Sequence, residues 1–267
     1  MLGTLVLAAS LSLAPHQGGQ LKLTNPHATY GFLGPTRPDD KVLPGDFYFV
    51  AFDIEGLDVR DDGTVQYSMG MELLNSKGES QFKKDPQDLE SNNSLGGTKM
   101  PGVMTAEIGT DTAAGKYTMK VTVTDRRAKK TETLTRDFDV LPKDFGLVRL
   151  QLTAVSNNPE PVPNVAVVGQ SVLLNCFALN FARDKSTDQP NVAVQITILD
   201  EAGKPTLAKP FSDVSKDVPK NMIAIPISLP LHLNRAGKYT VVVEATDKLG
   251  KKDPAKLSIP LTVVEQK

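Results

Sequence analysis

The feature that most constrains the fold is a pattern that the chain contains twice. The five residues Ala-Gly-Lys-Tyr-Thr stand at positions 114–118 and again at positions 236–240. An aspartate follows at the same distance in each copy, at Asp125 and Asp247. Landmarks that return in the same order indicate duplication of a unit of roughly 110–120 residues. A chain of 267 residues has room for two such domains.

Each copy alternates apolar and polar residues, for example at residues 117–124 and 239–246. A period of two is typical of half-buried β-strands. Residues 223–231 alternate as well, but Pro226 lacks a backbone N–H, so this strand is expected at a sheet edge or at a bulge. A short helical turn is expected only near residues 85–90. The pattern therefore predicts an all-β fold.

Two segments of the second copy resemble strands of immunoglobulin domains. Residues 169–176 read Gly-Gln-Ser-Val-Leu-Leu-Asn-Cys, which is similar to the second strand, cysteine included. Residues 237–241 read Gly-Lys-Tyr-Thr-Val, which resembles the sixth strand with its tyrosine corner. The chain is thus similar to the broad class of bacterial immunoglobulin-like domains. This resemblance implies two tandem immunoglobulin-like β-sandwich domains, a class used mainly for adhesion, spacing, chaperoning and domain presentation.

The resemblance also locates the two positions that a disulfide joins in antibody domains. These positions hold Phe52 and Met119 in the first copy, and Cys176 and Val241 in the second. Since Cys176 is the only cysteine, no intramolecular disulfide can form. We therefore expect apolar packing in place of the disulfide, with Cys176 as a small buried residue.

The first domain is expected at residues 20–141 and the second at residues 147–265. The linker between them is short, so a restricted arrangement is expected. Residues 24–45 contain four prolines and are interpreted as extended chain before the first core strand.

An apolar run at residues 1–13 is shorter than the roughly 20 residues of a transmembrane helix and fits the core of a secretory signal. We expect a signal peptide at residues 1–14. No Lys or Arg precedes the run and Pro15 follows it, so an N-terminal strand is the alternative. No later segment is apolar enough to cross a membrane, and no transmembrane segment is expected in the mature chain. The expected location is outside the cytoplasm: the periplasm, the cell surface or the extracellular space.

Signals for catalysis are missing from the sequence. The histidines His16, His27 and His232 are dispersed, and no nucleophile elbow, zinc-binding helix or phosphate loop is present. The formal net charge of −1 gives no general attraction to nucleic acid. We expect no cofactor, no nucleic-acid partner and no enzymatic activity.

Two charged loops of the first domain form the candidate binding site. Residues 53–62 hold five carboxylates, and residues 126–130 hold four basic side chains. In an immunoglobulin-like sandwich the two loops emerge at the same end, so we expect them side by side and pointing away from the second domain. The candidate binding residues are Arg126, Arg127, Lys129, Lys130, Asp58, Asp61 and Asp62.

These loops have three interpretations. They are ordinary solvated hairpins with weak mutual ion pairs, or they contact a protein or a surface glycan, or they bind Ca²⁺. The calcium ligands would be drawn from Asp53, Glu55, Asp58, Asp61 and Asp62, with Asp125 as a further carboxylate. Arg126 and Arg127 would compete with calcium for the same carboxylates.

The leading hypothesis is an exported, non-enzymatic binding or structural module of the cell envelope that makes protein or glycan contacts. The alternative is a periplasmic two-domain chaperone that acts by strand addition at a sheet edge. A third hypothesis is a hydrolytic enzyme, which would require a cluster of titratable side chains in a closed cleft.

Overall fold

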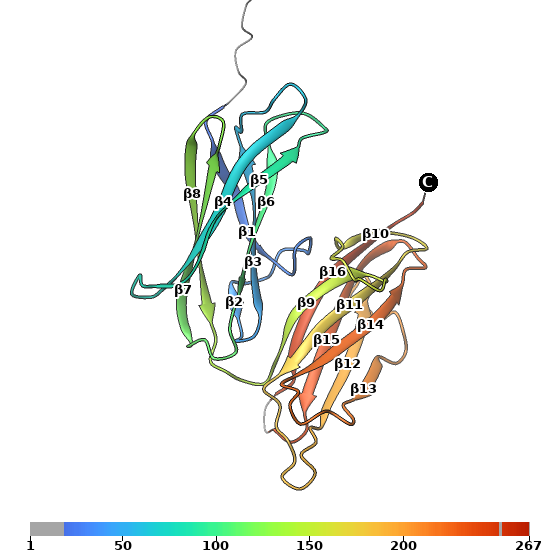
Figure 1. The fold of residues 1–267 in the computed structure, drawn as a ribbon. Helices are drawn as coiled ribbons and strands as arrows, with labels where there is room; N and C mark the ends of the chain where they lie inside the picture. Colours follow the sequence, from blue (N-terminus) through green and yellow to red (C-terminus); the bar gives the residue numbers. More distant parts are fainter. Residues whose placement is uncertain (1–18, 251–252, 267) are drawn as a thin grey trace, which may run out of the picture.

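The computed structural model describes residues 19–250 and 253–266, so the signal peptide expected at residues 1–14 lies outside the described residues. The fold is all-β, as predicted (Figure 1). The first eight strands are β1 (Lys22–Thr29), β2 (Lys41–Val42), β3 (Phe47–Glu55), β4 (Thr64–Asn75), β5 (Ser80–Asn92), β6 (Met100–Glu107), β7 (Gly115–Asp125) and β8 (Lys130–Val140). The other eight are β9 (Gly146–Ala154), β10 (Val165–Val167), β11 (Ser171–Leu179), β12 (Val192–Leu199), β13 (Phe211–Val214), β14 (Ala224–His232), β15 (Gly237–Asp247) and β16 (Ala255–Val264).

The strands form four sheets, which are consistent with two β-sandwich domains. β1–β8 form the N-terminal sheet pair, with strand orders β1-β3-β6 and β2-β8-β7-β4-β5. β9–β16 form the C-terminal sheet pair, with orders β14-β11-β9 and β10-β16-β15-β12-β13. Counted from the first strand of each pair, the two orders are the same. The duplicated motif thus corresponds to a repeated arrangement of strands.

Each sheet pair has its own apolar core, built by the alternation of side chains along the strands. In β3 the residues Tyr48, Val50, Phe52 and Ile54 are buried while their neighbours are partly exposed. Phe52 and Met119 belong to one core, and Cys176 and Val241 belong to the other. The expected apolar packing at the disulfide positions is therefore present. Among the described residues there is no helix long and apolar enough to cross a membrane.

Two local predictions are wrong. The helical turn expected near residues 85–90 lies inside β5, an exposed edge strand held by backbone pairing with β4. Residues 24–45 are more than extended chain, because β1 pairs with β3 along its length and buries Ala28. Prolines at an edge strand and in the following loop hid this strand, since they interrupt the apolar alternation without preventing pairing on one side.

Every edge strand of the four sheets carries a feature that hinders pairing with another chain. β2, β10 and β13 have only two, three and four residues. β1, β5, β6 and β14 contain proline, and the edge position predicted for the strand with Pro226 is confirmed. β9 is bulged: Arg149 and Leu150 stand opposite Cys176 of β11. The sheets thus offer few continuous backbone donors at their edges.

The two sheet pairs meet near the start of β9 (Figure 1), and the bulge in β9 places Arg149 against residues of the N-terminal pair. Arg149 has a φ of 57°, and its backbone N–H donates to Asp46 Oδ1 at 2.8 Å. Its Nε donates to the carbonyl of Gly45 at 2.8 Å, and its guanidinium lies 4.1 Å from the ring centre of Phe47. Gly45 has a φ of 97°, which favours glycine, and a Cβ there would force Leu179 Cδ1, 2.4 Å away, to shift. We call this contact the joint.

Burial raises the pKa of the Cys176 thiol to about 12. Because the thiolate is the reactive form, we expect the native chain to resist alkylation by iodoacetamide at pH 8, whereas the denatured chain reacts. Mass spectrometry after a labelling pulse measures this directly. Rapid labelling of the native chain would contradict the burial of Cys176 in the core of the C-terminal sheet pair.

Candidate functional site

Three loops gather at the end of the N-terminal sheet pair that is farthest from the joint (Figure 1). They span residues 56–63 between β3 and β4, residues 93–99 between β5 and β6, and residues 126–129 between β7 and β8. Backbone hydrogen bonds join the first two loops, from the N–H of Asn93 to the carbonyl of Gly63 and from that of Leu57 to that of Thr98. We call these three loops the distal tip.

Asp125 fixes two of the three loops to each other. Its side chain is buried, and Oδ2 accepts the backbone N–H of Asp58 at 2.7 Å. Oδ1 accepts the N–H groups of Arg127 and Ala128, both at 2.9 Å. Asp247, its counterpart in the repeat, accepts backbone N–H groups in the same way. The repeated aspartate is therefore a loop anchor, a role that the sequence reasoning missed.

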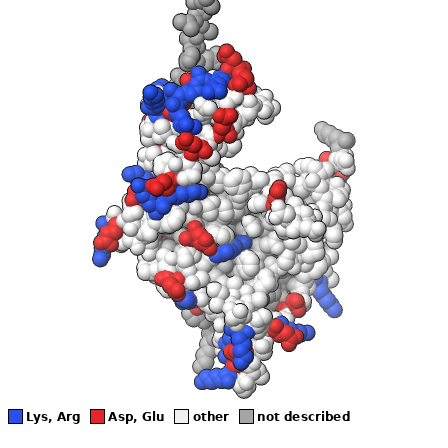
Figure 2. All heavy atoms as spheres, in the orientation of Figure 1, with Lys and Arg blue, Asp and Glu red and all other residues white. Residues whose placement is uncertain are grey.

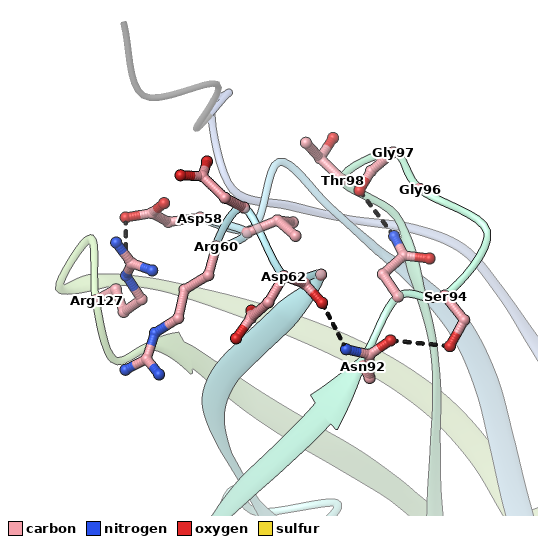
Figure 3. Close-up of a pocket in the computed structure, with 13 residues that line it drawn as sticks. Asp58, Arg60, Asp62, Asn92, Ser94, Gly96, Gly97, Thr98 and Arg127 are labelled. Atoms are coloured by element: carbon pink, nitrogen blue, oxygen red, sulfur yellow. Dashed lines mark hydrogen bonds and ion pairs between the residues drawn. The ribbon is translucent and has the colours of Figure 1, made fainter. Parts of the chain in front are cut away.

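Side-chain amides fix the third loop (Figure 3). Asn92 Nδ2 donates to the carbonyl of Asp62 at 2.9 Å, and Asn93 Nδ2 donates to the carbonyl of Gly97 at 2.7 Å. The loop holds Leu95, whose side chain is 99% exposed. The loop is fixed by its own hydrogen bonds and exposes this leucine to solvent. Sequence periodicity could not indicate such a feature.

Among the acidic and basic side chains of the candidate site, Arg127 and Asp58 form an ion pair across the two loops. Arg127 Nε is 3.5 Å from Asp58 Oδ2, and Arg126 pairs with Asp88 of β5 at 3.0 Å. Lys130 Nζ donates to the carbonyl of Gly19 at 3.2 Å. Figure 2 shows Lys and Arg next to Asp and Glu at this end of the molecule. The pair of Arg126 with Asp88 is exposed and contributes little to stability, whereas Asp58 in the other pair is largely buried.

An open hollow of about 1160 Å³ lies between the loops (Figure 3). Carboxylates, amides, hydroxyls and guanidinium groups surround it, without an aromatic ring. It is lined by Asp58, Val59, Arg60, Asp61, Asp62, Gly63, Asn92, Asn93, Ser94, Gly96, Gly97, Thr98 and Arg127. Of the candidate binding residues, Asp58, Asp61, Asp62 and Arg127 border the hollow, while Arg126, Lys129 and Lys130 do not.

The carboxylates considered for calcium do not converge on one point. Asp53 and Glu55 belong to β3, and Lys99 Nζ lies 2.7 Å from Asp53 and 4.0 Å from Glu55. The hydrogen bond from Lys99, together with one from Asn25, lowers the pKa of Asp53. Within residues 19–250 and 253–266, no three His, Cys, Asp or Glu side chains are arranged to hold a metal ion.

One exposed pair resembles the start of a nucleophile–base arrangement. Ser171 Oγ lies 2.8 Å from His232 Nδ1, because the two residues are direct partners across β11 and β14. In the described part of the chain, no carboxylate hydrogen-bonds to His232 as the third member of a triad would. The geometry is therefore that of a cross-strand polar pair.

Comparisons with known proteins leave the family open. No family model matches this sequence. No curated protein matches it either. Among solved structures, a red sea bream transglutaminase is similar over 92% of this chain and 31% of its own, at 12% identity and a TM-score of 0.29. Latent PorU from Porphyromonas gingivalis is similar over 97% of this chain and 22% of its own, at 12% identity and a TM-score of 0.40. The C-terminal domain of the AgI/II polypeptide BspA from Streptococcus agalactiae is similar over 90% of this chain and 100% of its own, at 9% identity and a TM-score of 0.30.

Proposed function

We propose that this chain is an exported, non-enzymatic binding or structural module of the cell envelope that contacts a protein or glycan partner through the distal tip. The observation that carries the proposal is the convergence of three mutually bonded loops at the end farthest from the joint. Binding residues concentrate on loops that a rigid scaffold positions, and Asp125 supplies that rigidity here.

We infer that each sheet pair is an immunoglobulin-like sandwich, with domains at residues 20–141 and 147–265. The repeated strand order supports this inference, since each pair sets a three-stranded sheet against a five-stranded one. Two tyrosine corners support it further. Tyr117 Oη donates to the carbonyl of Ala113 at 2.9 Å, and Tyr239 Oη donates to that of Arg235 at 3.1 Å. Both bonds reach four residues upstream of the tyrosine.

The partner is more consistent with a protein than with a glycan. The hollow has no aromatic ring on which a sugar could stack, and the fully exposed Leu95 matches an apolar socket. At the corresponding end of the C-terminal sheet pair, Asn180 donates to the carbonyl of Asp144 in the linker. The connection between the pairs therefore contacts that end, whereas the distal tip lies at the end farthest from the joint.

Strand addition, the chaperone hypothesis, receives less support. A donated strand needs a long edge with continuous N–H and carbonyl groups. The edges described above are short, bulged or interrupted by proline. We therefore retain the binding module as the proposed function.

The proposal predicts that neutralising the basic loop, residues 126–130, strongly weakens partner capture. Arg126, Arg127, Lys129 and Lys130 would be replaced by glutamine, and both forms would be used to retain proteins from envelope extract, with calcium and with a chelator. Retention should fall by about tenfold or more, because rim charges steer association and fix the register of the partners.

A matched control removes four positive charges elsewhere, at the exposed Lys77, Lys84, Lys116 and Lys204. This control should retain the partner as the unmodified chain does. Equal loss of retention in both variants would mean that net charge, and not the distal tip, causes the loss. Unchanged retention by the variant of the distal tip would refute the proposed surface.

A further inference from the structure

A second hollow, of about 730 Å³, opens in the C-terminal sheet pair between the end of β14 and the segment that follows β12. Its inner wall is the apolar core, where Leu231, Leu233, Leu261 and Val263 are buried. The full lining is Ile198, Thr206, Leu207, Phe211, Leu229, Pro230, Leu231, His232, Leu233, Asn234, Arg235, Tyr239, Leu261 and Val263. We call it the apolar pocket.

The N-terminal sheet pair explains why this pocket is open. There the edge strand beside β4 is β5, with thirteen residues. In the C-terminal pair the corresponding strand is β13, whose four residues pair only with residues 193–196 of β12 and leave its last three residues without a strand partner on that side. Apolar surface is consequently left in water at the mouth of the pocket, where Leu207 is 50% exposed and Phe211 is 41% exposed.

The rim of the pocket is polar and carries one fixed positive charge. Arg235 Nε donates to Tyr239 Oη at 3.2 Å, and Tyr239 Oη donates in turn to the carbonyl of Arg235. None of the lining residues is a carboxylate, although Asp200, outside the lining, interacts electrostatically with Arg235. In the repeat, Arg235 corresponds to Ala113, because the two corner tyrosines bond to these two carbonyls. The second copy thus has an arginine at the mouth of the apolar pocket where the first copy has an alanine.

We propose that the apolar pocket binds a small amphiphile, with an acyl chain against the leucines and an anionic end at Arg235. A concave, largely apolar site with a few polar groups at one end is the usual form of a small-molecule site. The guanidinium of Arg235 supplies the positive charge and the N–H donors that an anionic end needs. A donated β-strand fits poorly, since Pro226 and Pro230 interrupt β14.

The test is a fluorescence titration of the purified full chain with cis-parinaric acid, followed by competition with three ligands of equal chain length. Saturable binding of one probe per chain is expected. Dodecanoate and dodecyl phosphate should compete about tenfold better than dodecanol, because only they place a charge at Arg235. The two anions distinguish a fatty acid from a phosphate-bearing lipid. Absence of saturable binding, or equal competition by dodecanol, would overturn the proposal.

Variants distinguish binding in the pocket from nonspecific binding to exposed apolar surface. Arg235→Ala should abolish the preference for anions over dodecanol. Leu207→Asp should lower the affinity for every ligand by about tenfold, because it places a carboxylate at the mouth of the pocket. The matched control is Val214→Asp, which makes the same change at an apolar residue that is 43% exposed but lies outside the pocket lining. This control should bind as the unmodified chain does, and an equal loss there would overturn the site. Circular dichroism checks that each variant is folded.

Discussion

Replacing Asp46 by alanine is expected to lower the free energy of unfolding by about 3–5 kcal/mol, the range for removing one partner of a buried ion pair. Asp46 is 4% exposed, and its Oδ2 lies 3.1 Å from Nη1 of Arg37, which is also buried. The substitution leaves Arg37 as an unpaired charge in the interior. It also removes the acceptor of the Arg149 N–H, so the joint loosens.

Urea denaturation measures the loss of stability, and small-angle X-ray scattering measures the loosening as a larger radius of gyration. The double variant Arg37→Met with Asp46→Ala is the control, because it removes the stranded charge along with its partner. It should recover part of the stability but keep the loose joint. A loss below about 1 kcal/mol for Asp46→Ala alone, the value of an exposed pair, would contradict the buried arrangement.

Replacing Asp125 by alanine is expected to cost about 3 kcal/mol or more, because three backbone N–H groups lose a charged acceptor. Those of Asp58, Arg127 and Ala128 would exchange with solvent faster, which amide hydrogen exchange detects residue by residue. Partner capture by the distal tip should fall with this variant, since its loops are no longer fixed to each other.

Asp247→Ala is the matched comparison, because it removes the corresponding anchor from the C-terminal sheet pair. It accepts from two N–H groups, those of Ala182 and Leu249, so its loss should be smaller. Exchange at the distal tip should not change. Unaltered exchange at the tip in Asp125→Ala would contradict the anchoring role.

The repeated motif and the period of two were sufficient to predict an all-β fold with an edge strand at Pro226, because buried strands must alternate. β5 could not be predicted in this way. Almost all its side chains face water, so no apolar alternation marks it, and its conformation comes from backbone pairing with β4. The sequence pattern that indicates a strand is therefore found in β4 and not in β5.

The adjacency of the two charged loops was predictable from the order of strands, as the contact between Arg127 and Asp58 illustrates. The role of Asp125 in joining two loops was not, because the N–H of Asp58 that it accepts lies 67 residues away in the sequence. The apolar pocket was hidden for a similar reason. Its opening follows from the shortness of β13, which only the pairing of β12 reveals.

The most direct test of the distal tip as the contact surface is photo-crosslinking in cells that produce the chain. Benzoylphenylalanine would be placed at Asp61 in the tip, with Lys83 of β5 as an exposed control. The account predicts a discrete crosslinked product from position 61 and none from position 83. Products from position 83 alone, or equally from both, would contradict it.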